Sequence, residues 1–352
     1  MHTDPAGKKR PLGIIINPSS GRDARRLFAR ASPSSNESKR NQVERLIVGA
    51  AAAGVEQIIL VHDAFRIADG AAQALGVDVE IRLEDIGVRC NASDTVDAVT
   101  LMREAGCGAL AVLGGDGTSR IVARTWPEAT ILPLSTGTNN VFPVMLEATV
   151  AGAAAGLVAA GRVSRDTAAR RAKVIRIEVD GEEDDLALID AVKMVNDSTG
   201  NLLPFDPECM RSLVLSRALP DAVGMSPVGG LLEPCTADED FGVLVECVAP
   251  GAGRHRLLAP ISPGLFRSVE IGAHRRLALG ERVPLEGPGL IACDGDRERT
   301  LAPGQKAWLR VERDGPSVIH PGRTLAEAAR TGVYLDGEHW HDQRDGASFD
   351  CC

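Results

Sequence analysis

The sequence predicts a fold in two parts: an N-terminal doubly wound parallel α/β domain and a C-terminal all-β domain that is β-sandwich-like. Short apolar runs and helical stretches alternate five times in the first part, which is the pattern of strands and crossover helices in a parallel sheet. After about residue 174, strand-like runs follow one another without intervening helices. Hydrophobic residues make up 44% of the 352 residues and aromatic residues only 3%, so the core must consist mainly of Ala, Val, Leu and Ile.

The first domain is expected over residues 1–161. Its strands are predicted at short apolar runs, which are too short for amphipathic helices: 12–16, 57–61, 77–83, 109–113 and 131–134. Helices are predicted between them, at 22–30, 40–53, 66–74 and 93–105. Ser93 or Asp94 is the expected N-cap of the helix at 93–105, because either side chain can accept a hydrogen bond from the first turn.

Residues 141–161 carry a single charged side chain, Glu147, over a length that would suffice to span a membrane. Ala and Gly dominate this stretch, however, while Pro143 lies near its start and Glu147 in its interior. We therefore predict a buried helix that packs closely through small residues, and no membrane-spanning segment.

The second domain is expected over residues 162–322. It begins with the basic stretch 162–173, which fits either a solvated linker or a segment near the ligand cleft that attracts anions. Strands are predicted after it, at 174–179, 186–195, 211–216, 242–248, 267–271, 289–293 and 307–312. A helix is predicted at 323–331, and the polar tail 337–352 is expected to be flexible and dispensable for folding.

Composition and charge limit the partners, the location and the cysteine chemistry that can be expected of the chain. A net charge of -9 argues against nucleic acid as the main partner, because binding to a phosphate backbone needs a concentrated basic face. The first ten residues lack the apolar run of a signal peptide, so a cytoplasmic location is expected. The eight cysteines lack C-x-x-C spacing, which is typical of reduced thiols. Few aromatic residues are present to form a membrane-binding surface.

A polar loop follows the first predicted strand, and a phosphate there would meet backbone N–H groups and the positive end of the next helix. The candidate phosphate-binding residues of this loop are Asn17, Pro18, Ser20 and Gly21. Three arginines of the helix would either assist or form a solvated face: Arg22, Arg25 and Arg26.

Two further polar loops follow neighbouring buried strands, so they would meet at the same carboxyl edge of the sheet. The first is rich in glycine, which lets the backbone approach an anion, and it holds one carboxylate. Its candidates are Gly114, Gly115, Asp116, Gly117 and Thr118. A tight turn is the alternative, since Gly and Asp favour turns for conformational reasons. The second supplies hydroxyls and amides, from Thr136, Gly137, Thr138, Asn139 and Asn140. Two coincident polar loops favour a polar ligand.

These motifs carry a resemblance to a known superfamily. GGDGT at 114–118, PLSTGTNN at 133–140, NPSSG at 17–21 and DGD at 294–296 together resemble NAD kinases and diacylglycerol-type lipid kinases. The wording NPSSGRDARRL and PLSTGTNNVFP most resembles the acetoin catabolism protein X group of ATP-NAD kinase-like proteins. The resemblance covers roughly residues 12–335. It implies an NAD kinase-like fold in which the helix near 323–335 packs back on the first domain.

The resemblance also implies phosphoryl transfer from ATP with Mg²⁺. Asp116 would position the acceptor hydroxyl, as a base or through Mg²⁺, and the preceding loops would hold the phosphates. Asp296 would offer a second carboxylate across the cleft, although an ordinary hairpin explains Asp294 and Gly295 equally well. Arg120 would be an additional cation for the phosphates.

The chain departs from the families that it resembles in the loop that holds residues 136–140. NAD kinases usually carry an Asn-Glu pair and lipid kinases an Asn-Asp pair, whereas this chain has Asn139 and Asn140. The missing carboxylate would have accepted a hydrogen bond more strongly than a neutral group, which leaves the acceptor open. A segment at 225–230 resembles the acceptor loop of NAD kinases, and a plain loop fits it equally. Its candidate residues are Ser226, Gly229 and Gly230.

The sequence therefore predicts an ATP-dependent kinase that acts on a hydroxyl of a soluble nucleotide, with NAD(H) converted to NADP(H) as the first expectation. A lipid or small-alcohol kinase of the diacylglycerol kinase type is one alternative. A catalytically weak nucleotide-binding regulatory protein, linked to acetoin catabolism, is another. The expected partner is a small-molecule nucleotide, without nucleic acid or membrane, and a homo-oligomer is compatible with the sequence.

Overall fold

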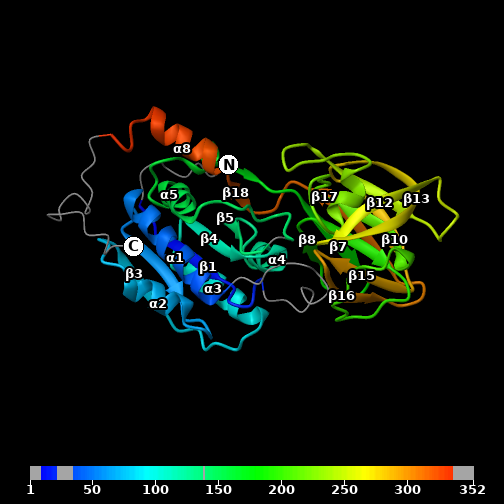
Figure 1. The fold of residues 1–352 in the computed structure, drawn as a ribbon, viewed down its shortest axis with the longest axis horizontal. Helices are drawn as coiled ribbons and strands as arrows, with labels where there is room; N and C mark the ends of the chain where they lie inside the picture. Colours follow the sequence, from blue (N-terminus) through cyan, green and yellow to red (C-terminus); the bar gives the residue numbers. More distant parts are fainter. Residues whose placement is uncertain (1–8, 22–34, 138, 336–352) are drawn as a thin grey trace.

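The computed structural model describes residues 9–21, 35–137 and 139–335. An α/β region with a parallel sheet lies beside an antiparallel β-rich region (Figure 1), which confirms the predicted fold class. Three predictions fall outside the described residues: the helix at 22–30 with its three arginines, the role of Thr138, and the flexible tail at 337–352.

Five parallel strands form most of the α/β sheet: β1 (Leu12–Ile16), β2 (Gln57–Val61), β3 (Glu80–Glu84), β4 (Ala109–Gly114) and β5 (Thr130–Ser135). The order is β3-β2-β1-β4-β5-β18-β6, in which β18 (Ser317–Ile319) is parallel to β5 and β6 (Ala169–Arg171) is antiparallel to β18. The chain order reverses between β1 and β4. Open α/β sheets bind ligands at such a switch point, beyond the carboxyl ends of the strands.

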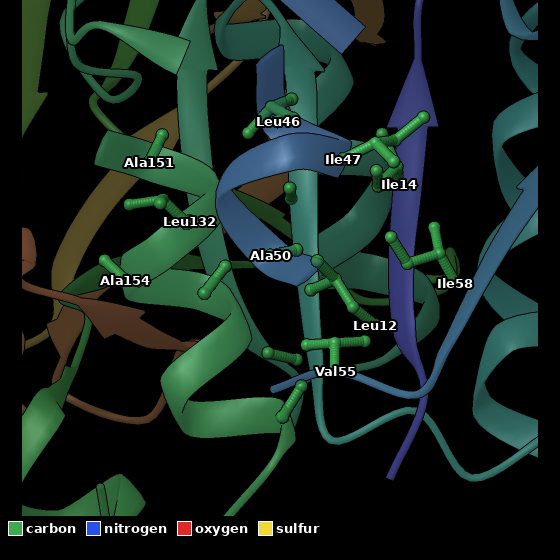
Figure 2. Close-up of a cluster of buried hydrophobic side chains, with 14 of the residues drawn as sticks. Leu12, Ile14, Leu46, Ile47, Ala50, Val55, Ile58, Leu132, Ala151 and Ala154 are labelled. Atoms are coloured by element: carbon green, nitrogen blue, oxygen red, sulfur yellow. The ribbon is translucent and has the colours of Figure 1, made fainter. Parts of the chain in front are cut away.

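Helices cover both faces of this sheet (Figure 1): α1 (Asn36–Ala52), α2 (Ile67–Ala74), α3 (Ala92–Glu104), α4 (Asp116–Thr125) and α5 (Ala148–Ala159). Side chains of a strand alternate between its two faces. Accordingly, Ala111 and Leu113 of β4 join the core under α1 and α5, whereas Leu110 and Val112 join the core under α3 and α4. Figure 2 shows the first of these cores.

Glycines bring α1 and α5 into close contact. A Cβ atom on Gly49 would lie 2.0 Å from the carbonyl oxygen of Thr149, and one on Gly152 would lie 2.1 Å from that of Leu46. The prediction of a buried helix packed through small residues is therefore confirmed, but its start is corrected. Glu147 is the N-cap of α5 rather than an interior residue, because its carboxylate accepts a hydrogen bond from Thr149 N at 2.7 Å. Among the described residues, no helix combines the length and apolar character needed to cross a membrane.

The β-rich region consists of two antiparallel sheets. One contains, in spatial order, β12 (His255–Ser262), β13 (Leu265–Ala278), β11 (Phe241–Cys247), β10 (Met210–Leu215), β9 (Asp190–Met194), β15 (Gly289–Cys293) and β16 (Asp296–Leu301). The other contains β14 (Val283–Glu286), β17 (Lys306–Glu312), β7 (Val174–Val179) and β8 (Asp185–Ala187). Ile175 and Leu309 of the smaller sheet share one core with Val214 and Ile291 of the larger, as in a sandwich.

Several boundaries differ from prediction. The apolar run 186–195 forms two strands, β8 and β9, which belong to different sheets. The N-cap of α3 is Asn91, whose side chain accepts from Ser93 N, and not Ser93 or Asp94. The helix predicted at 323–331 is α8 (Pro321–Arg330), and it packs against α5 of the α/β region.

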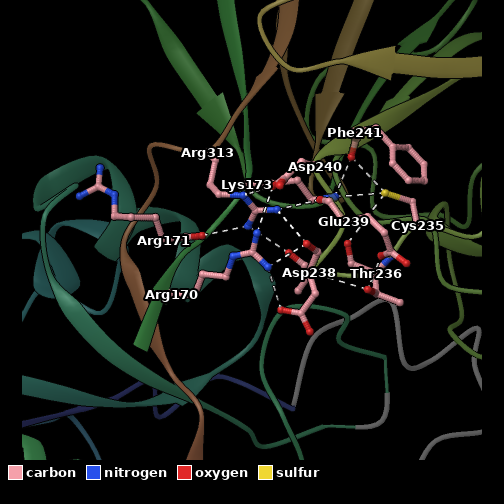
Figure 3. Close-up of polar contacts among 11 residues, drawn as sticks. Arg170, Arg171, Lys173, Cys235, Thr236, Asp238, Glu239, Asp240, Phe241 and Arg313 are labelled. Carbon is pink, nitrogen blue, oxygen red and sulfur yellow. Dashed lines mark hydrogen bonds and ion pairs between the residues drawn. The ribbon is translucent and has the colours of Figure 1, made fainter. Parts of the chain in front are cut away.

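The basic stretch 162–173 lies outside the cleft described below and is not a solvated linker. It forms α6 (Arg165–Ala168) and the edge strand β6, and Lys173 is buried. Lys173 Nζ donates to Phe241 O at 2.7 Å and lies 3.1 Å from Cys235 Sγ. Arg170 donates to Asp238 O at 2.8 Å (Figure 3). These contacts join the two regions of the molecule.

Candidate active site

A cleft of about 770 Å³ opens between the two regions. On the α/β side it is lined by the segments that follow β1, β2, β3, β4 and β5. On the β-rich side it is lined by residues 202–205, 223–225, 261–263 and 294–298. Most of the predicted site residues line it: Asn17, Pro18, Ser20, Gly21, Gly115, Asp116, Gly117, Thr118, Asn139, Asn140 and Asp296.

Asn17 connects the loop after β1 with the loop after β4. Its Nδ2 donates to Thr118 Oγ1 at 2.8 Å, and its Oδ1 accepts from the backbone N–H groups of Ser19 and Ser20 at 2.9 and 3.1 Å. These two N–H groups, expected to meet a phosphate, are therefore already engaged. Ser20 Oγ lies 2.5 Å from Thr136 Oγ1, so the loop after β5 joins the same network.

Lys39 was not apparent from the sequence as a site residue. It is fully buried on α1, and its Nζ donates to Pro18 O at 2.5 Å and lies 3.3 Å from Asn17 O. Burying an ammonium group is costly unless it is hydrogen-bonded, and these carbonyl groups supply such bonds. A positive charge thus lies directly beneath the loop after β1.

The GGDGT motif forms the end of β4 and the first turn of α4, and its glycines permit three close approaches. A Cβ atom on Gly114 would lie 2.6 Å from Thr118, and one on Gly115 would lie 2.9 Å from Asn140 Oδ1. A Cβ atom on Gly117 would lie 3.3 Å from Asp296 Oδ2. The motif therefore brings Asp296, from the β-rich region, next to the first turn of α4.

Asp116 is the first residue of α4 and is held by the segment after β5. Phe142 N donates to its Oδ1 at 2.8 Å, and Val141 N lies 3.2 Å from both carboxylate oxygens. The pKa of Asp116 is raised to about 7, mainly by burial and also by the charge of Asp294, whereas these backbone bonds and Arg217 oppose the rise. Such a carboxyl group titrates near neutral pH, as a general base should.

The two aspartates of the DGD motif have different surroundings. Asp294 has a positive φ of 49°, and its buried carboxylate accepts from Leu188 N, Ile189 N and Asp190 N at 2.8, 2.7 and 3.2 Å. It therefore fixes the turn between β8 and β9. Asp296 starts β16 and borders the cleft near Gly117.

Asp190 is another cleft carboxyl group, and the sequence did not reveal it because it lies within an apolar run that predicts only a strand. It is 7% exposed and lines the cleft, and its Oδ1 has no hydrogen-bond partner in the described part of the chain. Burial, followed by the charges of Asp294 and Asp116, raises its pKa well above the ordinary value.

Two arginines near the site make contacts that the sequence did not indicate. Arg217, which no motif indicated, packs 4.4 Å from the centre of the Phe142 ring. Its positive charge favours the ionised form of Asp116. Burial lowers the pKa of Arg217 to about 10, and Asp116 opposes this shift. Arg120, expected to be an additional cation for the phosphates, lines the cleft and is bonded to protein groups: its Nε donates to Leu186 O at 2.7 Å and its Nη2 to Asp185 at 2.8 Å.

The loop after β5 is stabilised by its own side chains. Ser135 Oγ donates to Gly137 O at 2.6 Å and accepts from Asn140 Nδ2 at 2.7 Å. Gly114, Thr136 and Gly137 support the loops without lining the cleft.

The candidate acceptor loop is the short helix α7 (Ser226–Gly230), all of which is buried. Ser226 Oγ donates to Arg217 O and accepts from Leu219 N, both at 2.9 Å. A Cβ atom on Gly229 or Gly230 would collide with Leu215 or Leu219 respectively. The contacts of Ser226, Gly229 and Gly230 are therefore with the protein core, and residues 223–225 line the cleft in their place.

The β-rich side also presents apolar side chains to the cleft. Leu202 and Leu203 are 46% and 49% exposed, and Phe65 on the α/β side is 50% exposed. Sequence patterns did not single them out, because isolated apolar residues in loops carry no periodicity.

Comparisons with known proteins agree with this architecture. The fold is similar to that of yeast NADH kinase, solved in complex with NADH, with a TM-score of 0.52 and 12% identity, covering 94% of this chain and 90% of that chain. The family model of the acetoin catabolism protein X C-terminal domain matches residues 173–314. Acetoin catabolism protein X of Cupriavidus necator is 37% identical over 332 residues, which cover 91% of this chain and 92% of that protein. The chain belongs to the acetoin catabolism protein X family.

Proposed function

We propose that the chain is an ATP-dependent kinase that transfers the γ-phosphoryl group to a hydroxyl of a soluble nucleotide, with NAD(H) as the first candidate acceptor. The observation that carries the proposal is the position of Asp116. It lies at the first turn of α4, where the loops after β1, β4 and β5 meet, and Asp296 of the β-rich region approaches the same turn at Gly117. A carboxylate among polar loops at the switch point of the sheet suits phosphoryl transfer, which depends mainly on positioning and electrostatics.

In this reaction the acceptor oxygen forms a bond to the γ-phosphorus of ATP, the bond from that phosphorus to the bridging oxygen breaks, and ADP leaves. Asp116 takes the proton of the acceptor hydroxyl, a role that a pKa of about 7 suits at neutral pH. The first turn of α4 holds the phosphates next to the loop at Asn17, and Lys39 adds positive charge beneath that loop.

Mg²⁺ would neutralise the triphosphate. Within the described residues, no group of three or more His, Cys, Asp and Glu side chains is arranged as a metal site. Mg²⁺ commonly needs only one or two carboxylates, with substrate phosphates and waters as its other ligands. Asp116 and Asp296 are oxygen donors of the required kind, and Asp190 offers a buried oxygen to which no described residue is hydrogen-bonded.

A lipid or small-alcohol acceptor is the second candidate, and the exposed apolar side chains of the cleft favour it. Leu202, Leu203 and Phe65 would stabilise an alkyl chain, although they would also contact the base of a nucleotide. A third candidate, a nucleotide-binding regulator with little activity, retains support from the absence of a carboxylate at Asn139 and Asn140.

The test is a transfer assay with γ-labelled ATP and Mg²⁺, offered NAD, NADH, diacylglycerol or small alcohols. Label in NADP(H) is expected. Label only in a lipid or an alcohol would select the second candidate. Nucleotide binding without transfer to any acceptor would select the third and overturn the assignment as a kinase.

A further inference from the structure

A histidine held by a buried aspartate lines the cleft at the carboxyl end of β2. His62 directly follows β2, and its backbone N–H donates to Glu84 O at 3.0 Å, which fixes its position against β3. Its ring Nδ1 lies 3.2 and 3.1 Å from Oδ1 and Oδ2 of Asp69. Neither residue has a role in the phosphoryl transfer described above.

Asp69 determines which ring nitrogen of His62 is available to a ligand. Its side chain is 9% exposed and accepts from His62 Nδ1. Burial would raise the pKa of Asp69, but its hydrogen bond with His62 and the charge of Arg66 oppose this, and the pKa is lowered overall. An ionised carboxylate only accepts hydrogen bonds, so it selects the imidazole tautomer that carries its hydrogen on Nδ1, in which Nε2 is an acceptor. No described residue bonds to Nε2.

The position of His62 points to the ribose of a nucleotide. Strand β2 is parallel and adjacent to β1, so His62 and the loop at Asn17 lie at the same edge and line the same cleft. When phosphates bind after the first strand of such a sheet, a side chain near the end of the second commonly contacts the ribose. Asp63 is the acidic residue there, but its carboxylate already accepts from Phe65 N and Ala68 N, both at 2.9 Å.

We propose that Nε2 of His62 accepts a hydrogen bond from a ribose hydroxyl of the bound nucleotide, and that the site thereby selects ribonucleotides over deoxyribonucleotides. A hydroxyl donates to this lone pair, whereas a phosphate oxygen would repel it. Asp69 is a positioning residue, because it fixes the tautomer and orientation of the ring. The proposal rests on the nucleotide-binding role of the cleft, but not on the identity of the phosphoryl acceptor.

The experiment measures equilibrium binding of ATP, 2′-deoxy-ATP and 3′-deoxy-ATP to the full chain. The wild type should bind ATP about tenfold more tightly than one of the two deoxy analogues, which is the usual effect of one hydrogen bond. His62→Ala should bind all three alike. His62→Gln, which retains an acceptor oxygen, should restore part of the preference. Asp69→Asn should reduce it, because an amide can present either its oxygen or its amino group to Nδ1. The matched control is His274→Ala, an exposed histidine of β13, and it should behave as the wild type.

Three results would overturn the proposal: equal binding of the three nucleotides by the wild type, a preference that survives in His62→Ala, or loss of the preference in His274→Ala. If His62→Ala does not fold, the comparison of His62→Gln and Asp69→Asn with the wild type decides the question. A wild type that binds no ATP would overturn the proposed function together with this inference. A wild type that transfers phosphate but ignores the ribose hydroxyls would overturn only this inference.

Discussion

On the α/β side of the cleft, the polar groups come from loops that each follow a strand of one parallel sheet. On the β-rich side, they come from segments far apart in the sequence, such as Asp190 at the start of β9 and Asp296 at the start of β16. The first arrangement follows from topology, because parallel neighbours end at a common edge. The second depends on tertiary packing. Asp116 connects the two sides, since its carboxylate is bonded within the α/β region and its pKa depends on Asp294 and Arg217 of the β-rich region.

The largest expected effect is the loss of catalysis on removing the charge of Asp116. Asp116→Asn keeps the size of the side chain and an acceptor for Phe142 N, so the protein should fold. The value of kcat should fall about 10²–10⁴-fold, the usual contribution of a general base, while ATP binding weakens much less. Steady-state kinetics and equilibrium ATP binding provide the measurements. Near-normal transfer activity would refute the catalytic assignment, and loss of the fold would indicate a structural turn.

Asp296→Asn tests whether the carboxylate on the β-rich side of the cleft takes part in the same reaction. A comparable loss of kcat is expected if both carboxylates act on one phosphoryl group. The double variant should then lose less than the product of the two single losses, because residues that act as a unit are not additive. Losses that multiply would show that Asp296 acts independently of Asp116.

The next effect concerns stability on the β-rich side. Asp294→Ala leaves the N–H groups of Leu188 and Ile189 without their acceptor and places alanine at a φ of 49°. Destabilisation of about 2–4 kcal/mol is expected from denaturant unfolding. Asp294→Asn is the matched control, because asparagine keeps an acceptor oxygen and tolerates this conformation. Equal stability of the alanine variant and the wild type would show that the carboxylate does not fix this turn.

The contrast between the two sides of the cleft explains which site residues could be predicted from the sequence. Asp116 and Asn17 were identifiable because their motifs are contiguous and follow buried strands. Asp190 was not, because one aspartate in an apolar run is compatible with an ordinary strand. The partners of Arg120 could not be foreseen, because Asp185 and Leu186 lie more than sixty residues further along the chain. The fold could be predicted further than the site, since hydrophobic periodicity specifies strands and helices but not which distant side chains meet.

A smaller effect is expected where Lys173 joins the two regions. Burial lowers the pKa of Lys173, and its hydrogen bond with Cys235 only partly opposes this shift. Between the folded and unfolded pKa values the unfolded chain therefore binds more protons, so this group makes stability rise with pH as the pH approaches 10.5. The unfolding free energy of Lys173→Met should not show that rise with pH. Unfolding free energies of both proteins from pH 7 to 10.5 provide the measurement, and parallel curves would contradict the expectation.

The smallest predicted effect on stability is at Gly117, which lies near Asp296 on the other side of the cleft. This glycine is in the first turn of α4, so Gly117→Ala should stabilise the helix by up to about 1 kcal/mol. The new Cβ atom would lie 3.3 Å from Asp296 Oδ2, however, and the carboxylate would have to move by a few tenths of an ångström. We expect kcat to fall several-fold, because small displacements in a phosphoryl-transfer site are costly.

Thermal unfolding and kinetics of Gly117→Ala, alone and combined with Asp296→Asn, separate the two causes. If the substitution acts by displacing Asp296, it should have almost no further effect on kcat once Asp296 has lost its charge. The same several-fold loss in both backgrounds would mean that Gly117 acts within the α/β region alone, through the phosphates bound at α4. In that case the contact between the two sides would contribute to the shape of the cleft and not to the reaction.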